Sequence, residues 1–272
     1  MAADGRGGLT PRRKRFGQHF LHDPAIIARI VETLAIRPAD HLLEIGPGRG
    51  ALTDRLMNCT DCTLDAIEID RDLAAQLQAR CGHAARFALH VCDALDFDFA
   101  ALATERGGKL RVIGNLPYNI STPLLFRLLA CADSITDATV MLQREVVARL
   151  AATPGGADYG RLTVMLAPVA AVDWLFDVGP GAFQPPPRVW SAVVRLNMRP
   201  APLFPLIPQY AQVVAAAFGQ RRKTLRNGLS QLLSREEIAA CGIDPGARPE
   251  TLAPQAFYLL AQALAAKNPA VV

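Results

Sequence analysis

The four residues Asn115-Leu116-Pro117-Tyr118 combine groups that suit a site for an aromatic amine. The side-chain carbonyl of Asn115 can accept a hydrogen bond from an exocyclic amine. Pro117 stiffens the turn and has no backbone N–H, so the carbonyl of Leu116 can point outward. Tyr118 supplies a flat face on which a base can stack. The tetrapeptide therefore predicts a place where an aromatic amine is held.

The flanking residues put this tetrapeptide at the end of a strand. An apolar run at residues 110–114 precedes it, and Ser121-Thr122-Pro123 indicates that a helix follows. We expect Thr122 to be the N-cap of that helix and Pro123 to occupy its first position. In α/β sheets the carboxyl ends of the strands form the edge at which ligands bind. The tetrapeptide is thus expected at a binding edge.

Short apolar runs alternate with amphipathic helical segments between residues 41 and 150. This pattern is typical of buried parallel strands in βαβ units, and right-handed crossovers then give a doubly wound sheet. Two later apolar stretches predict strands that close the sheet edge. The fold class is therefore α/β with a Rossmann-like sheet. The expected strands lie at residues 41–46, 63–69, 86–91, 110–115 and 137–143, with the two later ones within 161–176 and 191–198.

A proline-rich segment at residues 199–208 separates this pattern from a purely helical one. Ser234 and Glu237 have the spacing of a capping box, which marks the start of one of these helices. We expect a disordered tail over residues 1–10, a main domain over 11–200 and a small all-helical domain over 201–272. The other expected helices of the small domain cover residues 209–218, 222–233 and 254–265.

Positive charge is concentrated at two places in a chain whose net charge is +4. Residues 1–20 hold five basic residues against one acidic residue, and Arg221, Arg222, Lys223 and Arg226 form a second cluster. Local charge of this density favours a polyanionic partner, because phosphate contacts release counterions. A solvated tail and a solvated helix face explain the two clusters equally well.

The remaining composition points to a cytoplasmic protein without a metal site. No apolar run reaches the roughly 20 residues of a membrane helix, and the N-terminus lacks the apolar core of a secretion signal. Six cysteines are scattered without framework spacing. Cys59 and Cys62 form a C-x-x-C pair, but no second pair or histidine cluster accompanies it. We expect structural thiols there.

A glycine-rich loop, residues 44–51, follows the first expected strand and opens a helix. Gly46 and Gly48 allow a tight turn and a close approach of the backbone to a ligand. The same pattern matches a dinucleotide fingerprint, so the loop alone does not identify the ligand. In either case an acidic residue at the end of the second strand can bind ribose hydroxyls. Glu68 is favoured for this, Asp70 is the alternative, and both could instead be surface carboxylates.

Asp93 decides between the two kinds of cofactor. It follows the third expected strand, where its carboxylate can accept a hydrogen bond from the amine of a bound adenine. Recognition of an adenine amine and a ribose, with nothing that demands a pyrophosphate, suits S-adenosylmethionine. Together with Asn115, this favours methyl transfer over hydride transfer.

These motifs closely resemble the small-subunit ribosomal RNA adenine N6,N6-dimethyltransferases, the KsgA family. The resemblance implies a class I methyltransferase that uses S-adenosylmethionine and methylates two adjacent adenosines near the 3′ end of 16S ribosomal RNA. It also implies a part in small-subunit biogenesis, with the small-subunit precursor as partner, and we expect a monomer. The matching segments are residues 15–21, the glycine loop, 115–122, 183–191 and 218–227.

The resemblance also implies roles for single residues. Asn115 and the backbone carbonyl of Leu116 would accept the two N–H bonds of the amine and aim its lone pair at the methyl carbon. Tyr118 would stack on the base and Phe183 would cover its other face, although a core position under the proline loop is the other reading of Phe183. Many relatives carry Asn at position 19. The cofactor contacts would be His19, Leu21, Gly46, Glu68, Asp93 and Asn115.

RNA binding is expected in the helical domain. A helix over residues 222–233 would bring Arg222 and Arg226, four positions apart, to one face. Three alternatives stay open: a dimethylase of large-subunit ribosomal RNA, an assembly factor that chiefly binds RNA, and an NAD-dependent dehydrogenase. The last lacks a His–Asp pair that could serve a hydride site.

Overall fold

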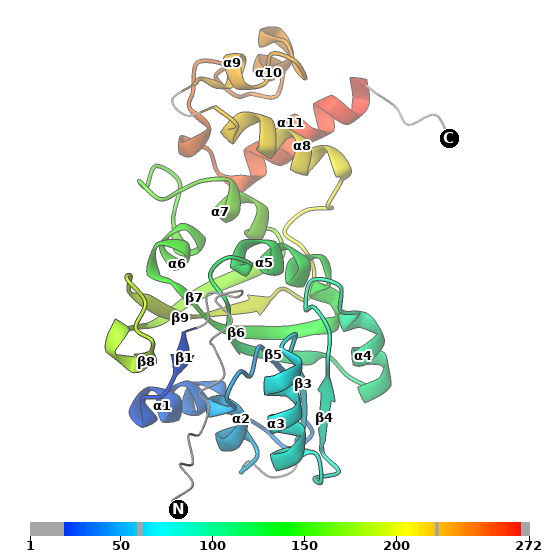
Figure 1. Cartoon of the computed structure of the whole chain (residues 1–272). Helices are drawn as coiled ribbons and strands as arrows, with labels where there is room; N and C mark the ends of the chain where they lie inside the picture. The colour runs from blue at the N-terminus through cyan, green and yellow to red at the C-terminus, as the bar shows by residue number, and fades with distance from the viewer. Residues whose placement is uncertain (1–18, 59–61, 221–222, 268–272) are drawn as a thin grey trace, which may run out of the picture.

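The computed structural model describes residues 19–58, 62–220 and 223–267 (Figure 1). The expectations for the tail at residues 1–10, for the motif residues 15–18, for Cys59 and for Arg222 lie outside these ranges. Cys62, the partner of Cys59 in the C-x-x-C pair, is buried in the core. Within the described ranges, no helix combines the length and apolarity needed to cross a membrane.

A seven-stranded sheet forms the centre of the larger lobe. Its strand order is β4-β3-β2-β5-β6-β9-β7. The first five strands are parallel, and β9 runs antiparallel between β6 and β7. All the expected strands are present, and the last two close the edge as predicted. The strands are β2 (His41–Ile45), β3 (Thr63–Ile67), β4 (Phe87–His90), β5 (Leu110–Asn115), β6 (Ile135–Gln143), β7 (Ala170–Val178) and β9 (Ser191–Met198).

One strand prediction is wrong in its first half. Residues 161–166 form the helix α7 (Arg161–Leu166), and β7 begins only at Ala170. Thr163 donates its hydroxyl to the backbone carbonyl of Arg149 and also accepts from the backbone of Gly160. These bonds hold the first turn of α7. In the sequence, an apolar run of this length is compatible with either a helix or a strand.

Helices cover both faces of the sheet, which confirms the doubly wound α/β fold (Figure 1). On one face pack α1 (Pro24–Leu34), α2 (Ala51–Leu56) and α3 (Arg71–Cys81). On the other pack α4 (Phe99–Arg106), α5 (Ser121–Ala130) and α6 (Arg144–Ala151). A separate two-stranded sheet joins β1 (Phe20–Leu21) to β8 (Phe183–Gln184), and so ties the start of the described chain to the proline loop.

Helix α5 begins two residues earlier than expected. Ile120, not Thr122, is its N-cap, without a side-chain capping bond. Ser121 donates its hydroxyl to the carbonyl of Tyr118 at 3.1 Å, and the N–H of Ile120 bonds the carbonyl of Pro117. The turn after β5 therefore runs directly into the helix. Pro123 still lies in the first turn, where a missing N–H costs no intrahelical bond.

The C-terminal helices form a second lobe with its own core, at the top of Figure 1. The capping box of Ser234 and Glu237 is confirmed. The predicted helix over residues 222–233 is wrong, because α9 spans only Leu225–Gly228, and the backbone N–H groups of Leu225 and Arg226 bond the carbonyls of Ala247 and Pro245. The other helices are α8 (Pro208–Phe218), α10 (Arg235–Ala240), η3 (Pro249–Thr251) and α11 (Pro254–Lys267).

Apolar contacts cross the expected boundary near residue 200. Tyr159 and Val164 belong to the core of the helical lobe. The hydroxyl of Tyr210 donates to the carbonyl of Val164 at 2.8 Å, and that of Tyr159 donates to the carbonyl of Leu252 at 2.7 Å. Helix α7 therefore connects the two cores.

Candidate active site

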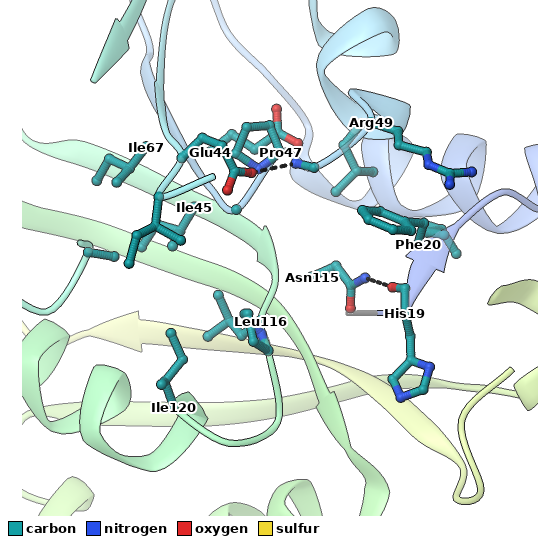
Figure 2. A pocket seen from close by; sticks show the side chains of 18 of the residues that line it. His19, Phe20, Glu44, Ile45, Pro47, Arg49, Ile67, Asn115, Leu116 and Ile120 are labelled. Carbon is teal, nitrogen blue, oxygen red and sulfur yellow. Dashed lines mark hydrogen bonds between the residues drawn. The ribbon is translucent and has the colours of Figure 1, made fainter. Parts of the chain in front are cut away.

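A cavity of about 290 Å³ lies at the carboxyl ends of β2, β3, β4 and β5 (Figure 2). This is the edge at which an α/β sheet binds its ligands. The structure brings all of the expected cofactor and amine residues to its wall, from segments far apart in the sequence. They are His19, Leu21, Gly46, Glu68, Asp93, Asn115, Leu116 and Tyr118.

The glycine loop exposes its backbone to the cavity. Gly46 and Gly48 have φ values of +67° and +57°, which L side chains rarely adopt. A Cβ added at Gly46 would meet no atom within 4 Å, so it would stand in open space at the cavity wall. A Cβ at Gly48 would lie 3.1 Å from the ring of Phe20. Glycine at these positions keeps room for a ligand and lets Phe20 pack against the loop.

Glu68 and Asp70 occupy different places. Glu68 is 3% exposed and accepts the N–H of Gly48 at 3.0 Å and that of Asp70 at 2.9 Å. Burial raises the pKa of Glu68, against the lowering effect of these backbone hydrogen bonds. Asp70 instead caps helix α3, where it accepts the N–H groups of Asp72 and Leu73. Of these two carboxylates, Glu68 is the one that lines the cavity.

Asp93 follows β4 at the cavity wall. One of its carboxylate oxygens accepts the N–H of Leu95 at 2.9 Å, which holds the side chain in place. The apolar side chains of Ile69 and Ala94 line the same cavity. A hydrogen-bond acceptor between apolar walls suits a flat, nitrogen-bearing ring.

The amide of Asn115 is held in one orientation. Its nitrogen donates to the backbone carbonyl of His19 at 2.9 Å (Figure 2). A carbonyl can only accept, so the NH₂ must face His19 and the amide oxygen must face the other way. By the same argument the Nδ1 of His19, 2.8 Å from the carbonyl of Pro185, carries a proton. This loop therefore fixes the acceptor oxygen of Asn115.

Tyr118 is also fixed. Its hydroxyl lies 2.6 Å from that of Ser191, which is fully buried at the start of β9. The ring of His19 lies 5.7 Å from that of Tyr118, tilted by 34°. Burial raises the pKa of Tyr118, and the hydrogen bond to Ser191 only partly opposes this. The phenol therefore stays protonated and serves as a neutral surface.

Glu44 and Phe20 also line the cavity, and neither was among the expected site residues. Glu44 is fully enclosed and accepts the hydroxyl of Thr53 at 2.6 Å; burial raises its pKa to about 7. The guanidinium of Arg49 lies 4.5 Å from the ring of Phe20. The signal for Glu44 was its place as the acidic first residue of the glycine-rich segment 44–51. Phe20 carried no signal beyond its apolar character.

Two expected substrate residues lie away from the cavity. Phe183 is 2% exposed and packs in the core, where β8 pairs it with Leu21. This matches the core reading of Phe183 rather than the stacking one. Arg226 is exposed on α9 in the helical lobe. Among the described residues, no group of His, Cys, Asp or Glu is arranged to hold a metal ion.

Comparisons with known proteins identify the relatives of this chain. A protein from Pseudomonas aeruginosa named ribosomal RNA small subunit methyltransferase A is 55% identical over 255 residues, covering 93% of this chain and 94% of that protein. The solved 23S rRNA methyltransferase ErmE is 28% identical, with a TM-score of 0.69, and covers 90% of this chain and 99% of its own.

A dimethyladenosine transferase from Plasmodium falciparum shares the fold, with a TM-score of 0.73 at 24% identity over 89% of this chain and 96% of its own. The family model described as ribosomal RNA adenine dimethylase matches residues 10–266. Both the fold and the sequence thus agree with the resemblance drawn from the motifs. The chain belongs to the ribosomal RNA adenine dimethylase family.

Proposed function

We propose that this protein transfers methyl groups from S-adenosylmethionine to N6 of adenosines in small-subunit ribosomal RNA. Its targets would be two adjacent adenosines near the 3′ end of 16S RNA, each converted to N6,N6-dimethyladenosine during small-subunit biogenesis. The observation that carries this proposal is the fixed oxygen of Asn115 beside the glycine loop and Glu68 in one cavity. The small-subunit methyltransferase at 55% identity supports the choice of RNA.

The residues present fit S-adenosylmethionine. Glu68 would accept from the ribose hydroxyls and Asp93 from the adenine amine, while the open space at Gly46 leaves room beside the backbone. When bound, this cofactor supplies a methyl group already activated on a sulfonium, so no nucleophilic side chain is needed. The remaining task of the chain is to hold the amine in place.

Two oxygens would hold that amine. The side-chain oxygen of Asn115 and the carbonyl of Leu116 would accept its two N–H bonds and draw the nitrogen toward tetrahedral geometry. Neighbouring carbonyls are engaged elsewhere: that of Pro117 by Ile120, and that of Tyr118 by Ser121. Groups fixed before the substrate arrives accelerate a reaction through orientation and electrostatics. Asn115 is such a group, because His19 already holds its amide.

The target adenine must leave any stack or base pair to reach this cavity. Tyr118 would then stack on it, with its ring held by Ser191. The buried position of Phe183 leaves it out of this contact. After transfer the proton would pass to water.

RNA outside the cavity would meet the helical lobe. Lys223 and Arg226 are both exposed there, at the end of the chain's second basic cluster. We expect the protein to act as a monomer. A protein with this substrate would work in the cytoplasm.

Methylation of large-subunit RNA is the less favoured alternative. The 23S rRNA methyltransferase ErmE is 28% identical to this chain, against 55% for the small-subunit enzyme. A role as an assembly factor is compatible with catalysis and does not compete with it. Family membership leaves no support for a dehydrogenase.

One assay tests the proposal. Small subunits that lack dimethyladenosine are incubated with the protein and cofactor labelled on its methyl group, and the label is located by nuclease digestion and mass spectrometry. We expect dimethyladenosine at two adjacent positions near the 3′ end of 16S RNA. Subunits that are already dimethylated serve as the control. Label confined to large-subunit RNA, or none at all, would contradict the proposal.

A further inference from the structure

The chain contains two tryptophans, and both are exposed: Trp174 lies in β7, and Trp190 directly precedes β9, the strand that pairs with β7. Trp190 is 56% exposed and Trp174 is 37% exposed. Strand alternation puts Trp190 on the face of Ala192 and Val194, and Trp174 stands directly opposite Val194. Large aromatic faces left in water on a folded protein indicate a binding surface.

Arg144 and Asp177 hold this surface together. The guanidinium of Arg144 lies 5.6 Å from the ring of Trp174 and donates its Nε–H to Asp177 at 2.9 Å. The indole N–H of Trp174 donates to the other oxygen of Asp177, also at 2.9 Å. The carboxylate therefore fixes both groups.

Trp190 is supported from beneath. Its carbonyl accepts the backbone N–H of Arg144 at 2.9 Å. Its indole lies over Gly179, where an added Cβ would come 3.7 Å from the ring. Arg188, two residues earlier, is exposed and adds positive charge. Of the nearby acidic groups, Asp177 is engaged as described above and Glu145 pairs with Arg149 at 3.6 Å.

This surface, the Trp174–Trp190 face, lies near the candidate active site. Ser191 follows Trp190 directly, and strand alternation points its side chain to the opposite face of the sheet, where it bonds the hydroxyl of Tyr118, the residue expected to stack on the target base. Only β6 separates β5, which carries Asn115, from β9. Two strand spacings are roughly 10 Å. An RNA strand whose base enters the cavity can therefore extend across this edge of the sheet to Trp190.

We propose that Trp190 stacks on a nucleotide that neighbours the target adenosine in single-stranded RNA. Trp174 offers a second face, and the exposed Arg188 neutralises an adjoining phosphate. Exposed aromatic faces beside arginines are the usual means of holding single-stranded nucleic acid. This inference rests on the proposed function, since it takes the strand beside the methylated adenosine as its ligand.

The two tryptophans themselves provide the readout. In a Trp174→Phe variant, Trp190 is the sole tryptophan, and its emission reports on the surface without a label. The full-length protein is titrated with a single-stranded 12-nucleotide oligoadenylate. We expect saturable quenching of Trp190. In an otherwise unchanged chain, Trp190→Ala should weaken binding of the fluorescein-labelled oligonucleotide by roughly 5- to 150-fold, the loss of one stacked base.

Matched variants separate stacking from folding and charge. Trp190→Phe keeps an aromatic face and should retain most of the affinity. Leu259→Ala removes an apolar side chain that is 39% exposed on α11 and should change nothing. The salt dependence of binding should be the same for Trp190→Ala as for the unchanged chain, because no phosphate contact is removed.

Two results would overturn the proposal. One is unchanged Trp190 emission while fluorescence anisotropy shows that the oligonucleotide binds. The other is a Trp190→Ala variant that binds whole small subunits poorly but the oligonucleotide normally, which would assign the surface to a ribosomal protein. A failure of the proposed function gives a different result. If the oligonucleotide quenched Trp190 but small subunits were not methylated, the proposed function would be wrong while the stacking surface would stand.

Discussion

The side-chain amide of Asn115 donates to the backbone carbonyl of His19, 96 residues earlier in the chain, at 2.9 Å. This bond joins the end of β5 to the loop that enters β1. His19 is in turn held by the carbonyl of Pro185 in the proline loop. Three distant segments thus decide which way one oxygen points.

Replacing Asn115 with alanine should remove the main acceptor for the amine. We expect turnover to fall by about 10²- to 10³-fold, the usual loss for a preorganised hydrogen-bonding group. Cofactor affinity, measured by calorimetry, should fall far less, because Glu68 and Asp93 remain. Near-normal turnover in single-turnover assays would exclude the role given to Asn115.

His19→Asn and His19→Ala test how Asn115 is oriented. Asparagine can still donate to the carbonyl of Pro185, whereas alanine cannot. We therefore expect His19→Asn to keep most of the activity and His19→Ala to lower kcat with little change in RNA affinity. Equal activity of the two variants would show that the bond to Pro185 does not matter.

Glu68 and Asp70 form a matched pair of carboxylates with separate functions. Hydrogen bonds to charged groups contribute about 1.5–3 kcal/mol, so Glu68→Gln should weaken cofactor binding by roughly 10- to 150-fold. Asp70→Ala should leave that affinity unchanged but destabilise the fold by about 1 kcal/mol, the usual cost of a lost N-cap. Calorimetry measures the cofactor affinity of the two variants, and urea denaturation measures their stability. If Asp70→Ala weakened cofactor binding and Glu68→Gln did not, Asp70 rather than Glu68 would be the ribose contact.

Glu44 should make stability depend on pH. Burial raises its pKa from the usual 4.5 to about 7, so the folded state binds more protons than the unfolded state between these values. Relative to the ionised form, protonated Glu44 stabilises the folded state by about 3 kcal/mol. This stabilisation is fully present below pH 4.5 and is lost as the pH rises through 7. Glu44→Gln cannot ionise, so its free energy of unfolding should fall less than that of the unchanged chain. Free energies of unfolding are measured by urea denaturation between pH 4.5 and 8. An equal change with pH in Glu44→Gln and in the unchanged chain would contradict this prediction.

Tyr118→Phe and Tyr118→Ala separate the ring from the hydroxyl. Phenylalanine keeps the stacking face but leaves Ser191 without its partner, at a cost of about 1 kcal/mol in stability. Alanine also removes the face, and kcat/KM should fall by roughly 5- to 150-fold, one stacked base. If both variants lost activity equally, the hydroxyl rather than the ring would be the essential group.

Local sequence determined much of this protein. The alternation of apolar runs and helical segments is a short-range property, so it located the strands and the doubly wound sheet. The carboxyl ends of parallel strands meet at one edge, so the order of the motifs along the chain was enough to group Gly46, Glu68, Asp93 and Asn115 at one site.

Long-range packing decided the rest. Phe183 is buried because the proline loop folds β8 against β1, and α9 begins only at Leu225, where the backbone N–H groups of Leu225 and Arg226 bond the carbonyls of Ala247 and Pro245. Trp174 and Trp190 come near each other only because β7 and β9 pair in one register. Such contacts depend on residues tens of positions apart, and no local pattern records which segments will meet.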